Sequence, residues 1–257
     1  MRGVVAASAG NHALGVAHAC LATGIRDAHV FVQNSASQSK IAKLRDYDVH
    51  LHLVGDTFEE TQQAALARAG ETGAVFISPY DHPHIIAGQG TCALEILDEL
   101  PDCDAIIVPA GGGALIAGVA VAAKAANPNI RIIGVNPTSS PSALLSLERG
   151  YAVDPYDHAP TLATGLAGGF GRYPFLVARD LIERIVLVSE DQMRQAIVEL
   201  MRTDNIIAEP SGIVAVAAAL YHQHALKLTG KTALIVSGGN IDDAELKVIM
   251  EAAEGGQ

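Results

Sequence analysis

The chain has 257 residues, of which 49% are hydrophobic and 18% charged, and its formal net charge at pH 7 is -11. A chain of this length buries a large core in one domain or two, and its composition excludes a disordered protein. The acidic balance argues against nucleic acid or an anionic membrane as the partner, because both attract basic faces. Small molecules are therefore the expected ligands.

Targeting signals and cysteine patterns add little to this picture. No apolar stretch is both long enough and free enough of glycine and polar residues to span a bilayer, and Met1-Arg2 leads into no secretory signal. Cys20, Cys92 and Cys103 are odd in number and far apart, so neither a disulfide framework nor a cysteine zinc cluster is expected. The sequence predicts a cytoplasmic protein.

Short apolar runs alternate with helical stretches along the whole chain. Strands this apolar, each followed by a helix, are typical of parallel sheets covered on both faces, so the predicted fold class is α/β. Thr57-x-x-Glu60 and Ser189-x-x-Gln192 have the form of capping boxes and mark two helix starts. The predicted strands are residues 3–7, 28–33, 49–54, 74–78, 105–108, 131–135, 185–188 and 233–236.

The first strand runs into the motif Ser8-Ala9-Gly10-Asn11-His12, which precedes a helix predicted for residues 12–23. A hydroxyl, an amide and an imidazole therefore lie beside the free backbone amides of a helix N-terminus. Such a loop can bind a carboxylate without a basic side chain. The same residues also suit a turn with capping side chains, so this motif alone leaves both interpretations open.

Three histidine pairs follow along the chain with one residue between partners. His50-x-His52 falls on a predicted strand, His82-x-His84 surrounds Pro83, and His222-x-His224 falls on a predicted helix. Residues two apart on a strand share a face and could bind a metal ion, but no third ligand stands at a convincing spacing. We therefore expect structural or surface roles for these histidines and no metal site.

Two segments interrupt the alternation of strands and helices. Pro79-Tyr80-Asp81-His82-Pro83 predicts a domain boundary, which gives a smaller lobe over residues 1–81 and a larger lobe over residues 82–257. Residues 138–174 are rich in serine, proline and glycine and too long for a plain connection. That segment is expected to wrap part of a site or an edge of the sheet.

A glycine turn, Gly111-Gly112-Gly113, follows the strand at residues 105–108 and opens into a helix. Its amides and the helix N-terminus suit a bound phosphate, although such turns also occur for packing alone. The sequence does not match the dinucleotide-binding fingerprint. Ile116 occupies the position of its third glycine, and no acidic residue that could bind a ribose follows the strand that ends near Asn136. Ser237-Gly238-Gly239-Asn240 follows the last strand, at the sheet edge where ligands of parallel sheets bind.

Together these three motifs resemble those of the fold type II pyridoxal-phosphate enzymes, in the threonine/serine dehydratase branch that includes serine racemases. The resemblance covers residues 3–242 and includes residues 85–95, 161–165 and 209–212. It implies two lobes with parallel sheets and pyridoxal 5'-phosphate as the cofactor. The implied reaction is β-elimination of a small hydroxy amino acid to a 2-oxo acid and ammonia. Family members are often dimers or tetramers, so a homo-oligomer is compatible with the resemblance.

The resemblance also implies roles for particular residues. Asn11 would bond the 3-hydroxyl of the cofactor ring, Ser237 would face its pyridine nitrogen, and Glu209 would lie near the ring. A neutral hydroxyl at Ser237 suits β-elimination, since it does not enforce protonation of the ring. The cofactor phosphate would bind to Gly111, Gly112, Gly113 and Ala114. The substrate carboxylate would bind to Ser8, Gly10, Asn11, His12 and the backbone of Gly165.

The chain departs from the family pattern at several positions. Ala114 replaces a fourth glycine, and its small methyl group is expected to preserve the phosphate site with some loss of fit. Ala9 stands where racemases carry a serine, which disfavours racemisation. Metal-binding members carry acids where this chain has Asn136, Ser142 and Thr164, so no cation is expected there. No regulatory extension is expected after the helix at residues 243–254.

The Schiff-base lysine of the family is not found in this sequence. In the family this lysine lies in a Ser-x-Lys-x-Arg-Gly-Ala-type motif that precedes the loop matched here by residues 8–12. No lysine in this sequence has that context, so no catalytic residue is identified. One expectation is an N-terminally truncated threonine/serine dehydratase that acts as part of a longer polypeptide. The alternative is a catalytically dead protein that binds pyridoxal phosphate or an amino acid. Hydroxyaspartate dehydratase and serine racemase are less favoured, and the hydroxy amino acid stays open.

Overall fold

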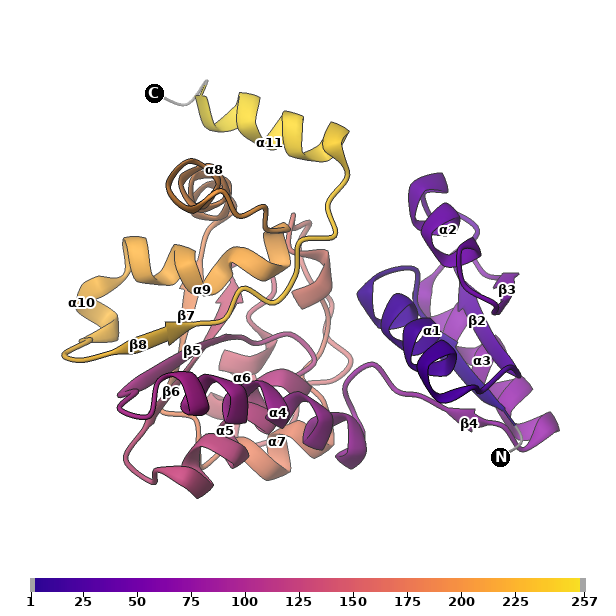
Figure 1. Cartoon of the computed structure of the whole chain (residues 1–257), viewed down its shortest axis with the longest axis horizontal. Helices are drawn as coiled ribbons and strands as arrows, with labels where there is room; N and C mark the ends of the chain where they lie inside the picture. The colour runs from indigo at the N-terminus through magenta and orange to yellow at the C-terminus, as the bar shows by residue number, and fades with distance from the viewer. Residues whose placement is uncertain (1–2, 255–257) are drawn as a thin grey trace. The chain divides into compact units, whose positions relative to one another are not determined.

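A computed structural model of the chain describes residues 3–254 and contains two four-stranded sheets (Figure 1). Residues 1–2 and 255–257, the outer ends of the two predicted lobes, lie outside the described residues. The backbone contacts divide the chain into two compact units, of which unit 1 ends at Pro79 and unit 2 begins at Tyr80. This division falls two residues before the predicted boundary at residue 81.

Unit 1 contains a parallel sheet of strand order β3-β2-β1-β4 with three helices. The two central strands are completely buried, as their apolar sequences predict. The helix α3 begins with the predicted capping box of Thr57 and Glu60. The elements are β1 (Val4–Ala7), α1 (Asn11–Thr23), β2 (Ala28–Val32), α2 (Gln38–Arg45), β3 (His50–Leu53), α3 (Phe58–Thr72) and β4 (Val75–Phe76).

Unit 2 contains a second parallel sheet, of strand order β7-β6-β5-β8. The predicted capping box of Ser189 and Gln192 begins the helix α8. The strands are β5 (Ala105–Pro109), β6 (Arg131–Pro137), β7 (Arg184–Val188) and β8 (Thr232–Leu234). The helices are α4 (Pro83–Glu99), α5 (Ala114–Ala126), α6 (Ser142–Arg149), the 3₁₀ turn η1 (Thr164–Leu166), α7 (Arg172–Ala178), α8 (Glu190–Asp204), α9 (Pro210–Tyr221), α10 (Gln223–Leu226) and α11 (Asp243–Glu254).

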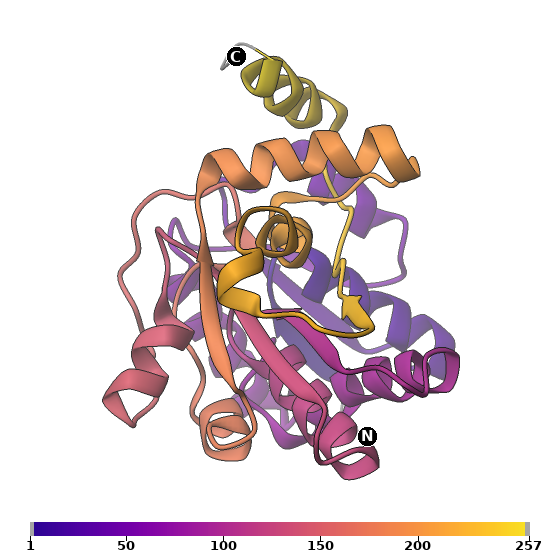
Figure 2. The same ribbon diagram turned by 90° about the vertical axis from the view of Figure 1, so that its left-hand side faces the viewer.

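Helices cover both faces of the sheet in unit 2, because successive residues of a strand point to opposite faces. Ile106 and Val108 of β5 belong to the core that includes residues of α4, α5 and α7. Ile107, between them, belongs to the core formed with α8 and α9. Figures 1 and 2 show the two helical layers, with α11 on the outer side of α8. This arrangement explains why β5 is apolar at every position.

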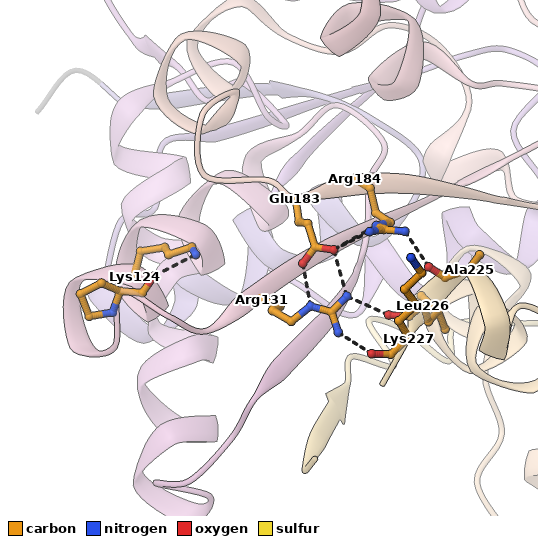
Figure 3. A network of polar contacts seen from close by, with 8 residues as sticks. Lys124, Arg131, Glu183, Arg184, Ala225, Leu226 and Lys227 are labelled. Atoms are coloured by element: carbon orange, nitrogen blue, oxygen red, sulfur yellow. Dashed lines mark hydrogen bonds and ion pairs between the residues drawn. The ribbon is translucent and has the colours of Figure 1, made fainter. Parts of the chain in front are cut away.

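A polar network connects the amino ends of β6 and β7 to α10 (Figure 3). Arg131 at the start of β6 donates two hydrogen bonds to the carboxylate of Glu183, at 2.7 and 2.9 Å. The same guanidinium donates to the carbonyls of Leu226 and Lys227, and Arg184 donates to Ala225. Because the planar guanidinium satisfies a carboxylate and two carbonyls together, it fixes the end of α10 against the sheet.

The structure confirms the α/β fold class and contains all eight predicted strands, with changes at their ends. Strand β4 is reduced to two residues, and β8 begins and ends earlier than predicted. The segment 138–174 is not wholly irregular, since it contains α6 and η1. His222 lies between α9 and α10 and not on a helix. None of the helices in residues 3–254 is long and apolar enough to cross a membrane.

Candidate functional site

The glycine turn of unit 2 connects the end of β5 to the start of α5. A Cβ atom on Gly112 would lie 2.2 Å from the ring of Tyr80, and one on Gly113 would lie 2.6 Å from Phe170. Gly113 also has a φ of 97°, which favours glycine over any other residue. The glycines are therefore required by packing on the protein side of the turn, in addition to the access for an anion that the sequence predicted.

The amides of this turn lack acceptors within the protein. Across residues 3–254, no hydrogen bond uses the amide of Gly111, Gly112, Gly113 or Ala114 as its donor. Gly111, Gly113 and Ala114 are buried, and buried amides without an acceptor are rare in folded proteins. Since these donors precede the positive end of the helix α5, the turn has the chemistry of an anion site.

Asn136 holds the start of the glycine turn. Its side chain is fully buried, and its Nδ2 donates to the carbonyl of Ala110, the residue before Gly111. Its Oδ1 accepts a hydrogen bond of 3.2 Å from the amide of Leu144 in α6. The side chain thus joins β6, the turn and α6. Sequence reasoning considered Asn136 as the end of a strand without a ribose-binding acid and as a substitute for a cation ligand, and it missed this role.

Gly165 lies directly against the glycine turn. A Cβ atom on Gly111 would lie 3.0 Å from the carbonyl oxygen of Gly165, so the turn and η1 touch through backbone atoms. The amide of Gly165 donates to Oγ of Ser211 in α9, at 2.9 Å. Unit 2 therefore brings together two segments that are more than fifty residues apart in the sequence, and Ser211 holds Gly165 against α9.

The loop after β8 packs on the N-terminal end of α9. The amide of Glu209 donates to the carbonyl of Gly238 at 3.0 Å, and a Cβ atom on Gly212 would lie 2.3 Å from that carbonyl oxygen. Ser237, the residue before Gly238, is exposed. Glu209 and the residue after Ser237 are thus neighbours.

The predicted carboxylate-binding residues of unit 1 lie at the N-terminus of α1. Ser8 is held by its amide, which donates to the carbonyl of Phe31 at 3.0 Å, and its Oγ accepts from the amide of Gly10. Asn11 is exposed at the first position of the helix. The amides in the first turn of a helix have no acceptor within the helix, so this loop can bind a small anion.

His12 is oriented by a hydrogen bond of 2.9 Å between its Nε2 and the carbonyl of Ile77. A carbonyl only accepts, so Nε2 carries the proton and Nδ1 is left as an acceptor. Burial lowers the pKa of His12 below its usual 6.5, although the bond to Ile77 acts in the opposite direction. The imidazole is therefore neutral at neutral pH, and its ring connects α1 to the chain after β4.

Comparison with known proteins assigns a family to this arrangement. The family model for pyridoxal-phosphate dependent enzymes matches residues 1–238. The chain belongs to this family. It is 44% identical over 243 residues to the L-threonine ammonia-lyase of Thermotoga maritima, a match that covers 94% of the chain and 59% of the relative's length. The chain thus spans about three fifths of that curated relative.

Solved structures agree with the family assignment. The processed form of threonine deaminase isoform 2 from Solanum lycopersicum superposes with a TM-score of 0.92 at 38% identity, covering 98% of this chain and 70% of that one. Maize serine racemase superposes with a TM-score of 0.88 at 35% identity, covering 99% and 78%. The family match confirms the resemblance to fold type II enzymes of the threonine dehydratase branch.

The residues of the turn fit the cofactor of this family at its phosphate group. A phosphate offers several acceptor oxygens and negative charge, and the turn offers buried amides without acceptors at a helix N-terminus. The methyl group of Ala114 is buried in the core of unit 2, where it packs with the side chains behind the turn. The alanine in place of a fourth glycine is thus compatible with this set of donors.

Proposed function

We propose that this chain carries the cofactor-binding and substrate-binding residues of a pyridoxal-phosphate-dependent threonine/serine dehydratase. The reaction is β-elimination of a hydroxy amino acid to a 2-oxo acid and ammonia. The observation that carries the proposal is the row of four amides at residues 111–114 that have no acceptor among residues 3–254, in a chain 44% identical to an L-threonine ammonia-lyase. The proposal includes a cytoplasmic location and homo-oligomeric assembly.

Each group of residues has a separate task in this proposal. When bound, pyridoxal phosphate supplies an electron sink for the α-carbon of the substrate. The amides of the glycine turn would neutralise its phosphate, Asn11 would bond its ring hydroxyl, and Ser237 would face its ring nitrogen with a neutral hydroxyl. Glu209 would lie near the ring, as the resemblance implies.

The carboxylate of the substrate is assigned to the loop at the start of α1. Ser8 shapes this loop by accepting a hydrogen bond from the amide of Gly10. His12 anchors the loop through its hydrogen bond to the carbonyl of Ile77. The first-turn amides of α1 then receive the carboxylate, with Asn11 as a further donor. A neutral His12 leaves the binding of the anion to these amides.

Two measurements test the proposal on the protein expressed from its own gene. With pyridoxal phosphate present, L-threonine or L-serine is expected to yield a 2-oxo acid and ammonia in equal amounts. Asn11→Ala is expected to weaken pyridoxal-phosphate binding about tenfold, the equivalent of one hydrogen bond to an ionised group. Asn34→Ala, at another exposed asparagine of unit 1, is the matched control and should bind the cofactor normally. Equal affinity for both variants would contradict the role of Asn11.

A second function is favoured by the lysines of the sequence. None of the lysines in the sequence lies in a segment that resembles the family's lysine motif. They are Lys40, Lys43, Lys124, Lys227, Lys231 and Lys247. A protein that binds pyridoxal phosphate yet forms no 2-oxo acid from any hydroxy amino acid would be a binding protein. Borohydride reduction followed by peptide mass spectrometry separates the cases: a dehydratase should retain the cofactor on a lysine within the family's motif, and a binding protein should retain it on no lysine. In neither case do we expect it on one of these six residues.

A further inference from the structure

Strands β2 and β3 of unit 1 bring several histidines to one face of the sheet. His29 of β2 pairs directly with His50 of β3, and Phe31 pairs with His52 two residues later. Paired residues of parallel strands point to the same side, so these four rings form a stack. The ring centroids of His29 and His50 are 4.7 Å apart, and those of Phe31 and His52 are 4.4 Å apart.

An acidic residue completes this group at the start of β2. Oδ1 of Asp27 lies 3.0 Å from Nε2 of His29. Gly3 makes room for the carboxylate, since a Cβ atom on Gly3 would lie 2.3 Å from Oδ2 of Asp27. One ligand atom each of Asp27, His29 and His50 lies within 4.8 Å of the other two. We propose that Asp27, His29 and His50 form a binding site for a divalent ion of the zinc class.

The orientation of His29 supports a metal ligand. Only 7% of this residue is exposed, and its Nδ1 lies 2.9 Å from Nε2 of His52. When Nδ1 of His29 donates a hydrogen bond to His52, Nε2 carries no proton and its lone pair faces the carboxylate of Asp27. A cation bound to both groups then removes the repulsion between this lone pair and the carboxylate. Histidine ligands are commonly fixed in this way, through a hydrogen bond to their second nitrogen.

His52 can receive that hydrogen bond through its Nε2, which lies 2.9 Å from Nδ1 of His29. A neutral imidazole with its proton on Nδ1 leaves Nε2 as an acceptor. His52 is therefore a positioning residue for the site and not a ligand.

The ligand set selects the type of ion. Two imidazoles and one carboxylate are ligands that zinc and neighbouring transition metals bind well, whereas magnesium and calcium prefer a shell of oxygens. Zinc bonds of about 2.0–2.1 Å place the ligand atoms roughly 3.4 Å apart in a tetrahedron, so the carboxylate of Asp27 must move slightly away from Nε2 of His29, which is now 3.0 Å from it. Asp27 and His50 are exposed, so their side chains can adjust around the buried His29. A water molecule would take the fourth position.

Such an ion would join β2 to the edge strand of the sheet. Among residues 3–254, strand β3 pairs with β2 alone, and none of its four residues is fully buried. A bound ion that contacts His29 and His50 stabilises the folded state by mass action and protects an edge that is otherwise held by few apolar contacts. The site lies wholly within unit 1 and does not depend on the proposed dehydratase function.

Zinc binding to the full chain, without pyridoxal phosphate, tests the proposal. Equilibrium dialysis against Zn²⁺ is expected to show one tight ion per chain, which excess Mg²⁺ does not displace. His50→Asn and Asp27→Asn each remove an exposed ligand and should weaken this binding at least about tenfold. His52→Asn should weaken it about tenfold through the orientation of His29. Co²⁺ in place of Zn²⁺ should give the visible absorption of a four-coordinate site, and His50→Asn should remove it.

Other histidine pairs of the chain supply the control. His84→Asn changes His82-x-His84 and should leave both the stoichiometry and the affinity for Zn²⁺ unchanged. Circular dichroism confirms that each variant is folded. Absence of tight Zn²⁺ binding to the unaltered chain would overturn the proposal, and so would equal affinity of the unaltered chain, His50→Asn and Asp27→Asn.

Discussion

His12 shows how one side chain connects the candidate anion loop to the rest of unit 1. Its Nε2 donates to the carbonyl of Ile77, and burial lowers its pKa below 6.5. His12→Ala leaves that carbonyl without its donor, which is expected to cost about 1–3 kcal/mol of unfolding free energy. His12→Gln should restore part of the loss, because its amide can donate to the same carbonyl. Urea unfolding at neutral pH measures both variants, and equal stability of the two would contradict the role of the hydrogen bond.

The lowered pKa of His12 also predicts a pH dependence of stability. The unfolded state takes up a proton on this histidine near pH 6.5, while the folded state resists protonation until a lower pH. The contribution is therefore present above pH 6.5 and is lost as the pH falls below it. The stability of the natural chain relative to His12→Gln should decrease between pH 7.5 and pH 5.5. A constant difference would show that His12 has the same pKa folded and unfolded.

Gly112 tests whether the glycine turn is specified by packing. Gly112→Ala places a Cβ atom 2.2 Å from the ring of Tyr80, and such overpacking costs about 1–3 kcal/mol. The shift of the turn should also weaken the binding of inorganic phosphate or pyridoxal phosphate. Gly88→Ala in α4 is the matched control, since nothing lies within 4 Å of its Cβ position and alanine favours a helix by up to about 1 kcal/mol. Gly88→Ala should therefore be neutral or stabilising in a urea titration.

At the scale of elements, the position of the glycine turn depends on β6 and α6 through Asn136. Asn136→Leu keeps a similar volume but leaves the carbonyl of Ala110 and the amide of Leu144 without partners. Each lost partner is expected to cost about 1–3 kcal/mol. Weaker binding of pyridoxal phosphate should accompany the loss, because Ala110 precedes the turn. Glu148→Gln, at an exposed position of α6, is the control and should change neither quantity.

The elements that sequence patterns predicted are those whose signals are local. Apolar runs located all eight strands, and the capping boxes at Thr57 and Ser189 were confirmed, because each depends on residues close together in the chain. The helix α6 was missed since it begins after Pro141 without a capping side chain, within a segment rich in serine and proline. Strand β4 was predicted too long, as its pairing with β1 covers only two residues.

The same distinction between local signals and contacts of distant residues applies to the site residues. The glycine turn and the loop at residues 8–12 were predicted from sequence because both follow strands, where ligand sites of parallel sheets gather. Two hydrogen bonds of the site join residues 26 or more positions apart. The amide of Gly165 donates to Ser211, and the side chain of Asn136 donates to the carbonyl of Ala110. The partners of His50 lie on another strand, so its spacing from His52 could not reveal them. Contacts between distant elements therefore required the structure.

At the scale of the whole molecule, the two units differ in how much core stabilises them. In unit 2, two large clusters pack on both faces of β5 and β6. In unit 1 the buried residues form three smaller clusters, and its edge strands β3 and β4 contain no fully buried residue. Local opening requires less free energy where fewer buried contacts are lost.

We therefore expect unit 1 to open before unit 2. In native-state hydrogen exchange, the amides of β3 and β4 should exchange much faster than those of β5 and β6, and moderate urea should increase exchange in unit 1 first. Zn²⁺ should slow exchange in β3, if the ion binds as proposed, without affecting β5. Unit 1 contains six basic and seven acidic residues, whereas unit 2 contains eleven basic and twenty-one acidic ones, so added salt screens like-charge repulsion mainly in unit 2 and should not reverse their order. Equal protection of β3 and β5, lost together at one urea concentration, would show instead that the chain unfolds as a single cooperative unit.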